Sequence, residues 1–128
     1  MRCLIVDDNA DFVDAARGLL ETQGITVVGA ASDSAAALHR FSELRPEVTL
    51  VDVNLGRESG LELAEQLHCI GSPEPSPVIL ISTHSAQDFL DLIASSPAVG
   101  FLSKSDLSAT SIRDLVREST GRNEGDLR

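Results

Sequence analysis

The chain has 128 residues, of which 42% are apolar and 23% charged. These values suit one globular domain whose core needs neither a disulfide framework nor a structural metal. Asp and Glu number 20 against 10 Lys and Arg, for a formal charge of −10. That balance disfavours direct binding to nucleic acid and to an anionic membrane surface, because both need clustered basic side chains.

Five short apolar runs alternate with helical patterns along the chain. The runs are nearly continuous, as in parallel strands that helices cover on both faces, and they predict strands at residues 3–6, 25–28, 48–51, 78–81 and 99–102. Apolar residues at helical spacing predict one helix after each strand. In chain order these residues are Phe12, Ala15, Ala16, Leu19 and Leu20; Ala37, Leu38, Phe41 and Leu44; Leu61, Ala64 and Leu67; Phe89, Leu92 and Ile93; and Ile112, Leu115 and Val116.

Turn and cap residues separate these elements. Gly24 is placed to end the first helix, Asp33 or the preceding Ser to begin the second, and Pro46 follows the end of the second. The Pro-rich segment 71–77 indicates an exposed loop. From residue 121 onward the chain is polar and expected to fray, so we predict one domain over residues 1–120 and a polar C-terminal tail over 121–128.

Five strand–helix units with short connections predict an α/β fold, a single three-layer doubly wound (βα)5 sandwich. The common flavodoxin-like strand order for such a parallel sheet is 2-1-3-4-5, which makes strands 1 and 3 neighbours at a switch point. Ligands of these sheets bind beyond the carboxyl ends of the strands. The residues that end the strands are therefore expected to carry the function.

Chemically active side chains stand at those strand ends. Asp7 and Asp8 follow the first strand, Asp52 the third, Ser82 the fourth and Lys104 the fifth. Three carboxylates at the switch point repel one another unless a cation neutralises them, and Mg²⁺ suits such oxygen ligands. A Lys and a hydroxyl beside them can hold phosphoryl oxygens, and a carboxylate that attacks phosphorus becomes an acyl phosphate. Each residue alone is usually a cap, a turn or a solvated side chain, but together they predict a metal-assisted phosphoryl site.

Four stretches of the sequence, taken together, resemble the receiver domain of bacterial two-component response regulators of the chemotaxis-regulator type. They are LIVDDN, TLVDVNLGRESGLELA, VILIST and GFLSKSDL, and the resemblance covers residues 1–120. It implies a cytoplasmic phosphorylation-dependent switch that takes a phosphoryl group on Asp52 from a sensor histidine kinase or a phosphotransfer protein. It implies a regulator rather than an enzyme, which at most catalyses its own phosphorylation and dephosphorylation.

The resemblance also implies roles around the phosphoacceptor. Asp8 and Asp52 would ligate Mg²⁺ through carboxylates, Asn54 through its backbone carbonyl, and Asp7 through a water. Lys104 would contact the acyl phosphate. These residues would form the phosphorylation site itself.

The output of such a domain would involve a second group of residues. The Ser82 hydroxyl and the Phe101 ring would move together as the switch, and Asn54 and His84 would tune dephosphorylation. The face made by the fourth strand, the fourth helix, the fifth strand and the fifth helix would bind an output protein or domain, or a second copy of the chain.

Two positions depart from the family pattern. The family often has Pro after the Lys, where this chain has Ser105, and Phe101 lacks the hydroxyl of a Tyr. A cis bond before a residue other than Pro costs about 3–4 kcal/mol, so we expect the Lys104–Ser105 bond to be trans. Both departures concern the details of output rather than the phosphoacceptor chemistry.

Three other functions share parts of the pattern. A haloacid-dehalogenase-type phosphatase needs a second Asp two residues after the first, where this chain has Asn54. A flavodoxin-like FMN carrier needs a loop that cradles phosphate, which Asp7 and Asp8 would repel. A pseudo-receiver, an interaction module with the fold but without phosphorylation, is the main alternative.

The remaining polar residues indicate structural roles. Cys3 and Cys69 are expected to be reduced, partly buried thiols, and His39 and His68 surface or boundary side chains. No four-ligand zinc spacing links them. The start of the sequence lacks a signal-peptide pattern, and no apolar run reaches the length of a membrane span.

Overall fold

The computed structural model describes residues 1–56, 58–70, 76–83 and 96–126, with side chains described as far as residue 118. The described elements are β1 (Arg2–Val6), α1 (Ala10–Thr22), β2 (Thr26–Ala31), α2 (Ser34–Leu44), β3 (Val48–Asp52), β4 (Asn54–Leu55), β5 (Glu58–Ser59), α3 (Gly60–Ile70), β6 (Val78–Ser82), β7 (Gly100–Ser103), the 3-10 turn η2 (Lys104–Asp106) and α5 (Ala109–Asp126). The predicted fourth helix, with Phe89, Leu92 and Ile93, lies outside the described residues.

The main sheet has five parallel strands in the order β2-β1-β3-β6-β7. Since β4 and β5 form a separate two-stranded antiparallel sheet, β6 and β7 are the fourth and fifth strands of the main sheet. The predicted order 2-1-3-4-5 and the doubly wound α/β fold are therefore confirmed. Val6 pairs with Val51 and Ser82 with Ser103, so the strands end together at one edge.

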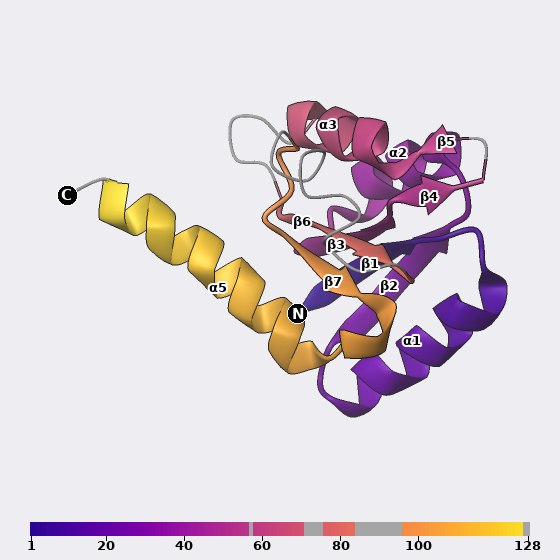
Figure 1. Cartoon of the computed structure of the whole chain (residues 1–128), viewed down its shortest axis with the longest axis horizontal. Coiled ribbons are helices and arrows are strands. Elements are labelled where there is room, and N and C mark those ends of the chain that lie inside the picture. Colours follow the sequence, from indigo (N-terminus) through magenta and orange to yellow (C-terminus); the bar gives the residue numbers. More distant parts are fainter. Residues whose placement is uncertain (57, 71–75, 84–95, 127–128) are drawn as a thin grey trace.

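Helices lie on both faces of the sheet (Figure 1), and an apolar layer packs between the sheet and the helices on each face. The layer beneath α1 and the start of α5 includes Ile5, Leu20 and Ile112, all essentially inaccessible to solvent. The layer beneath α2 and α3 includes Leu4 and Leu63, equally buried. Along β1, β3 and β6 the side chains alternate between the two layers, as expected for strands that are covered on both sides.

The second strand is longer than the sequence predicted. It was expected to end at residue 28, but it runs on to Ala31 through Gly29 and Ala30. Gly and Ala have low strand propensity, yet here they pair with Leu4 and Ile5 of β1 after a register shift. A Cβ on Gly29 would lie 2.7 Å from a methyl carbon of Leu44, so close packing against α2 favours a small residue here.

The helices agree with most of the predicted pattern. Asp33 caps α2 by accepting a hydrogen bond from the Ala36 N–H at 2.7 Å. It is one of the two residues that the sequence offered for this cap. The buried face of α1 is Val13, Ala16 and Leu20, whereas Ala15 and Leu19, both expected on that face, are exposed. Leu19 follows Ala16 by three residues, so helical spacing alone does not exclude it from the buried face; the way α1 packs onto the sheet leaves it facing solvent.

The last helix runs through most of the predicted tail. Residues 121–126 belong to α5, whereas the sequence predicted fraying there. Figure 1 shows this end of α5 extending away from the sheet. Extending a helix that is already nucleated costs little. The domain boundary at residue 120 itself stays a prediction.

The described helices include none with the length and apolar character needed to cross a bilayer. His39 and His68 are both exposed, as predicted.

The two cysteines differ in exposure. Both are free thiols; Cys3 in β1 is buried and Cys69 in α3 is exposed, so the expectation of partial burial is wrong for Cys69. Burial raises the pKa of the Cys3 thiol to about 12. The reactive thiolate is therefore scarce at Cys3 even at mildly alkaline pH.

We expect a thiol reagent to label one cysteine in the native chain and two after unfolding in denaturant. Cys69→Ser should abolish native labelling, while Cys3→Ser should leave it unchanged. Rapid labelling of two thiols in the native parent, measured by the absorbance of the released reagent, would contradict the burial of Cys3.

Candidate functional site

Three carboxylates meet at the carboxyl edge of the sheet. Asp7 and Asp8 follow β1, and Asp52 ends the adjacent strand β3. One oxygen from each of the three lies within 4.8 Å of the others. Asp7 and Asp52 are buried, whereas Asp8 is exposed. The topology thus brings together the three acids named from the sequence.

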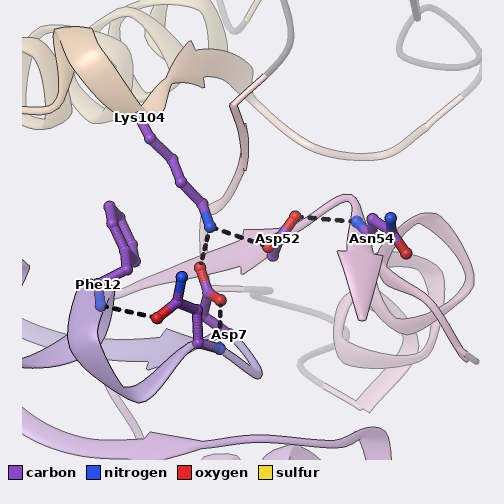
Figure 2. Close-up of polar contacts among 6 residues, drawn as sticks. Asp7, Phe12, Asp52, Asn54 and Lys104 are labelled. Carbon is purple, nitrogen blue, oxygen red and sulfur yellow. Dashed lines mark hydrogen bonds and ion pairs between the residues drawn. The ribbon is translucent and has the colours of Figure 1, made fainter. Parts of the chain in front are cut away.

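Lys104 reaches the two buried acids from the end of β7, the strand at one edge of the sheet. It begins η2, directly after β7, and its side chain is only 12% exposed. Its Nζ lies 2.6 Å from Asp7 Oδ2 and 3.1 Å from Asp52 Oδ2. Figure 2 shows the Lys104 side chain extending to both carboxylates.

Backbone N–H groups hold the other oxygen of each buried acid. The Asn9 N–H donates to Asp7 Oδ1 at 2.8 Å, and the Asn54 N–H donates to Asp52 Oδ1 at 2.9 Å. In both cases the donor is two residues beyond the acid, in the tight turn that ends the strand. The orientations of Asp7 and Asp52 are therefore set by local backbone geometry as well as by Lys104.

Burial and charge oppose each other at Asp52 and Lys104. Burial raises the pKa of Asp52 above its ordinary value, the Asn54 and Lys104 hydrogen bonds lower it, and the charge of Asp7 raises it again. Burial alone lowers the pKa of Lys104, but its hydrogen bonds and charge pairing with Asp7 and Asp52 outweigh that effect and raise it. Lys104 thus stays an ammonium. Any further positive charge nearby would stabilise the ionised form of Asp52.

The acids and Lys104 together suit a divalent cation. Three ionised carboxylates and one ammonium leave a net charge of about −2 at the site. The three acids offer carboxylate oxygens as metal ligands, and Mg²⁺ prefers oxygen ligands. An open hollow of about 240 Å³ borders two of the acids, with Asp7, Asp8 and Asp14 but not Asp52 in its wall. The residues present therefore fit Mg²⁺.

The remaining residues named from the sequence lie at or near the same edge. Ser82 ends β6 and is buried, one residue beyond the partner of Asp52 in the ladder. Phe101, on β7, is half-buried and packs against the layer beneath α2 and α3. Asn54 begins β4 with its side chain exposed. His84 lies outside the described residues, so its role in dephosphorylation stays a prediction.

Sequence reasoning assigned no role to two glycines that shape the site. A Cβ on Gly60 would lie 1.9 Å from the backbone oxygen of Asp52, and the Gly60 N–H donates to the Val53 oxygen at 2.9 Å. Gly56 has a φ of +69°, and a Cβ there would lie 3.3 Å from Asp8 Oδ2. Their presence in the segment after Asp52 was the available signal, because turns that pass close to backbone favour Gly.

A family match decides the classification. The family described as the response regulator receiver domain matches residues 3–117, which include all three acids and Lys104. The chain belongs to this family. Receiver domains are regulatory domains, and the predicted family is thus confirmed.

Relatives of this receiver domain include proteins with a further activity. The protein-glutamate methylesterase/protein-glutamine glutaminase of Archaeoglobus fulgidus is 30% identical over 121 residues, which cover 92% of this chain and 34% of that protein. A transcriptional regulatory protein of Bacillus subtilis, YvfU, is 29% identical and is covered over 58% of its length. The chain therefore spans between about a third and three-fifths of these relatives, and it matches them through the receiver domain alone.

Solved receiver domains share the fold over nearly the whole chain. The signal receiver domain of NarL from Mycobacterium tuberculosis is 29% identical with a TM-score of 0.73, and the match covers 97% of this chain and 96% of that one. The signal receiver domain of a modulated diguanylate cyclase from Desulfovibrio desulfuricans G20 is 25% identical with a TM-score of 0.76, covering 98% and 97%.

Proposed function

We propose that this receiver domain is a phosphorylation-dependent switch that accepts a phosphoryl group on Asp52 from the phosphohistidine of a histidine kinase or phosphotransfer protein. One observation carries the proposal. The buried Asp52 carboxylate lies among two further acids and the Lys104 ammonium, which is 3.1 Å away. A nucleophile, a set of ligands for a cation and a contact for phosphoryl oxygens are thereby within reach of one another.

The transfer itself needs little from the protein beyond positioning. A carboxylate oxygen of Asp52 bonds to phosphorus while the bond from phosphorus to the donor imidazole nitrogen breaks, and the imidazole takes that electron pair. Lys104, already beside Asp52, is placed to contact a phosphoryl oxygen. The Asn54 N–H holds the other oxygen of Asp52 at 2.9 Å, which restricts rotation of the carboxylate during attack.

Asp7, Asp8, Asp52 and the carbonyl of Asn54 would hold Mg²⁺, with Asp7 acting through a water. When bound, Mg²⁺ supplies positive charge to the carboxylates and to the phosphoryl oxygens. The raised pKa of Asp52 supports this assignment, since a cation favours the ionised form that attacks phosphorus.

The output would follow from the charge gained at Asp52. A phosphoryl group adds about −1.5 to −2 in charge. The Ser82 hydroxyl and the Lys104 ammonium would contact its oxygens. Movement of Ser82 and Phe101 would then alter the surface around β6, β7 and α5, and so the affinity for an output protein, an output domain or a second copy. The cytoplasm is the expected compartment, where histidine kinases present their phosphohistidine.

Acetyl phosphate with Mg²⁺ tests the function on the chain itself. We expect intact mass spectrometry to show one added phosphoryl group, removed by hydroxylamine as an acyl phosphate should be. Omission of Mg²⁺, or its chelation, should abolish the addition. A chain that stays unmodified with acetyl phosphate, and also with a phosphorylated histidine donor, would instead be the pseudo-receiver of the alternative hypothesis.

Removal of Asp8 should mainly affect the metal. Asp8 is the exposed acid of the three, so Asp8→Ala leaves the buried Asp7–Lys104–Asp52 contacts in place. We expect Mg²⁺ affinity to fall by about tenfold or more, in the range seen when support for a metal site is lost. Asp14→Ala, in the wall of the same hollow, is the matched control. Equal losses for both variants in calorimetric titration would indicate a diffuse acidic surface rather than a ligand.

A further inference from the structure

The Lys104 ammonium has an aromatic neighbour in addition to its two acids. Its Nζ lies 4.3 Å from the centroid of the Phe12 ring, on the ring face. This is within the range in which the negative face of an aromatic ring attracts a cation. Figure 2 shows the Phe12 ring beside the end of the Lys104 side chain, on the side opposite Asp52.

Phe12 is held in place by the same residue that orients Asp7. Asn9 caps α1, and its Oδ1 accepts a hydrogen bond from the Phe12 N–H at 3.2 Å. The Asn9 N–H in turn donates to Asp7 Oδ1. The ring is partly buried and packs against the layer beneath α1. A single turn therefore places both the acid and the ring that contact Lys104.

We propose that Phe12 is a positioning residue that keeps the Lys104 ammonium beside Asp52 when a metal ion competes for the acids. This inference rests on the proposed function. Asp7 and Asp52 serve as partners of Lys104 and as expected contacts of Mg²⁺, so binding of the cation weakens their hold on the ammonium. The Phe12 ring offers no oxygen to Mg²⁺, so Mg²⁺ does not displace the Lys104 ammonium from it.

The ring also limits water around the ammonium. Lys104 is 12% exposed although it ends in a charge, and Phe12 covers part of the ammonium. A less hydrated ammonium interacts more strongly with an incoming phosphoryl oxygen. Phe12 would thus act on the phosphoryl transfer through Lys104, without touching the reacting atoms.

The rate of phosphorylation at saturating Mg²⁺ tests this role. We expect Phe12→Leu, which keeps an apolar side chain but removes the ring, to slow labelling by acetyl phosphate about fivefold. That change equals ~1 kcal/mol at 1.36 kcal/mol per tenfold. Phe12→Tyr should restore the rate because it restores the ring face. The affinity for Mg²⁺ should remain near that of the parent in both variants, since Phe12 contributes no ligand.

A spectroscopic signal separates positioning from a general packing effect. The ε-methylene protons of Lys104 should show a ring-current shift in NMR spectra of the parent and of Phe12→Tyr, and lose it in Phe12→Leu. The shift should persist after addition of Mg²⁺ and beryllofluoride. Phe41→Leu, the same substitution beneath α2, where Phe41 is buried in the other layer, is the control and should change neither the shift nor the rate.

The outcomes distinguish this inference from the proposed function. If the parent is phosphorylated and Phe12→Leu matches its rate, or if the Lys104 shift disappears when Mg²⁺ binds, the role of Phe12 is overturned and the proposed function stands. A slow Phe12→Tyr variant would likewise contradict an effect of the ring face. If the parent itself is never phosphorylated, the proposed function fails, and the role of Phe12 in the reaction fails with it.

Discussion

Asp52→Asn is expected to abolish phosphorylation of the chain by acetyl phosphate. The substitution preserves the size of the side chain and the oxygen that accepts the Asn54 N–H. It replaces the anionic nucleophile by an amide and removes the negative partner of Lys104, which lies 3.1 Å away. Without a carboxylate at this position no acyl phosphate can form. Intact mass should therefore show the parent with one added phosphoryl group and the variant with none.

The matched control for this experiment is Asp14→Asn. It removes one negative charge from the wall of the hollow beside the site but no group in contact with Lys104. It should be labelled to the same extent as the parent. Labelling of Asp52→Asn at the level of the parent would assign the acceptor to another carboxylate, and peptide mapping would test Asp7 and Asp8 first because both lie in the same cluster.

Gly60→Ala is expected to destabilise the fold severely. A Cβ at this position would stand 1.9 Å from the carbonyl oxygen of Asp52 and 2.9 Å from the Cα of Val53. Both are backbone atoms and cannot rotate away as a side chain could. The start of α3 would have to separate from the end of β3, breaking the hydrogen bond from the Gly60 N–H to Val53. We expect the free energy of unfolding to fall by about 3 kcal/mol or more.

Gly18→Ala gives the opposite expectation for the same chemical change. Gly18 lies in α1, and a Cβ there would meet no atom within 4 Å. Since Ala is a better helix former than Gly, this variant should gain about 0.5–1 kcal/mol. Urea unfolding followed by circular dichroism compares the two variants directly. A Gly60→Ala chain as stable as the parent would mean that β3 and α3 do not approach as closely as described.

The order of the elements and the edge that carries the site could be predicted from the sequence. Continuous apolar runs between helical patterns are consistent with few folds other than a covered parallel sheet, and the handedness of its crossovers restricts the strand order. Once that order is known, the residues after β1, β3, β6 and β7 must emerge at one edge. Asp7, Asp52, Ser82 and Lys104 could for this reason be named without coordinates.

Features that depend on pairing across the sheet were beyond the sequence pattern. The extension of β2 to Ala31 depends on a register shift against β1, and the two-residue ladder of β4 and β5 is too short to leave a periodic signal. The same limit applies to Leu19, which fits an apolar pattern but faces solvent. In each case local propensity is weak, and contacts between distant segments decide the outcome.

The sequence by itself determined which residue types stand at the strand ends, and hence the kind of chemistry to expect there. Only the tertiary structure decided how those residues pair. It placed the Lys104 ammonium between Asp7 and Asp52, set the Phe12 ring against it, and brought Gly60 against the backbone of Asp52. These contacts join residues from different elements, and their distances depend on how the helices pack onto the sheet. Packing is the sum of many weak contacts across the whole core, so no local stretch of sequence encodes it.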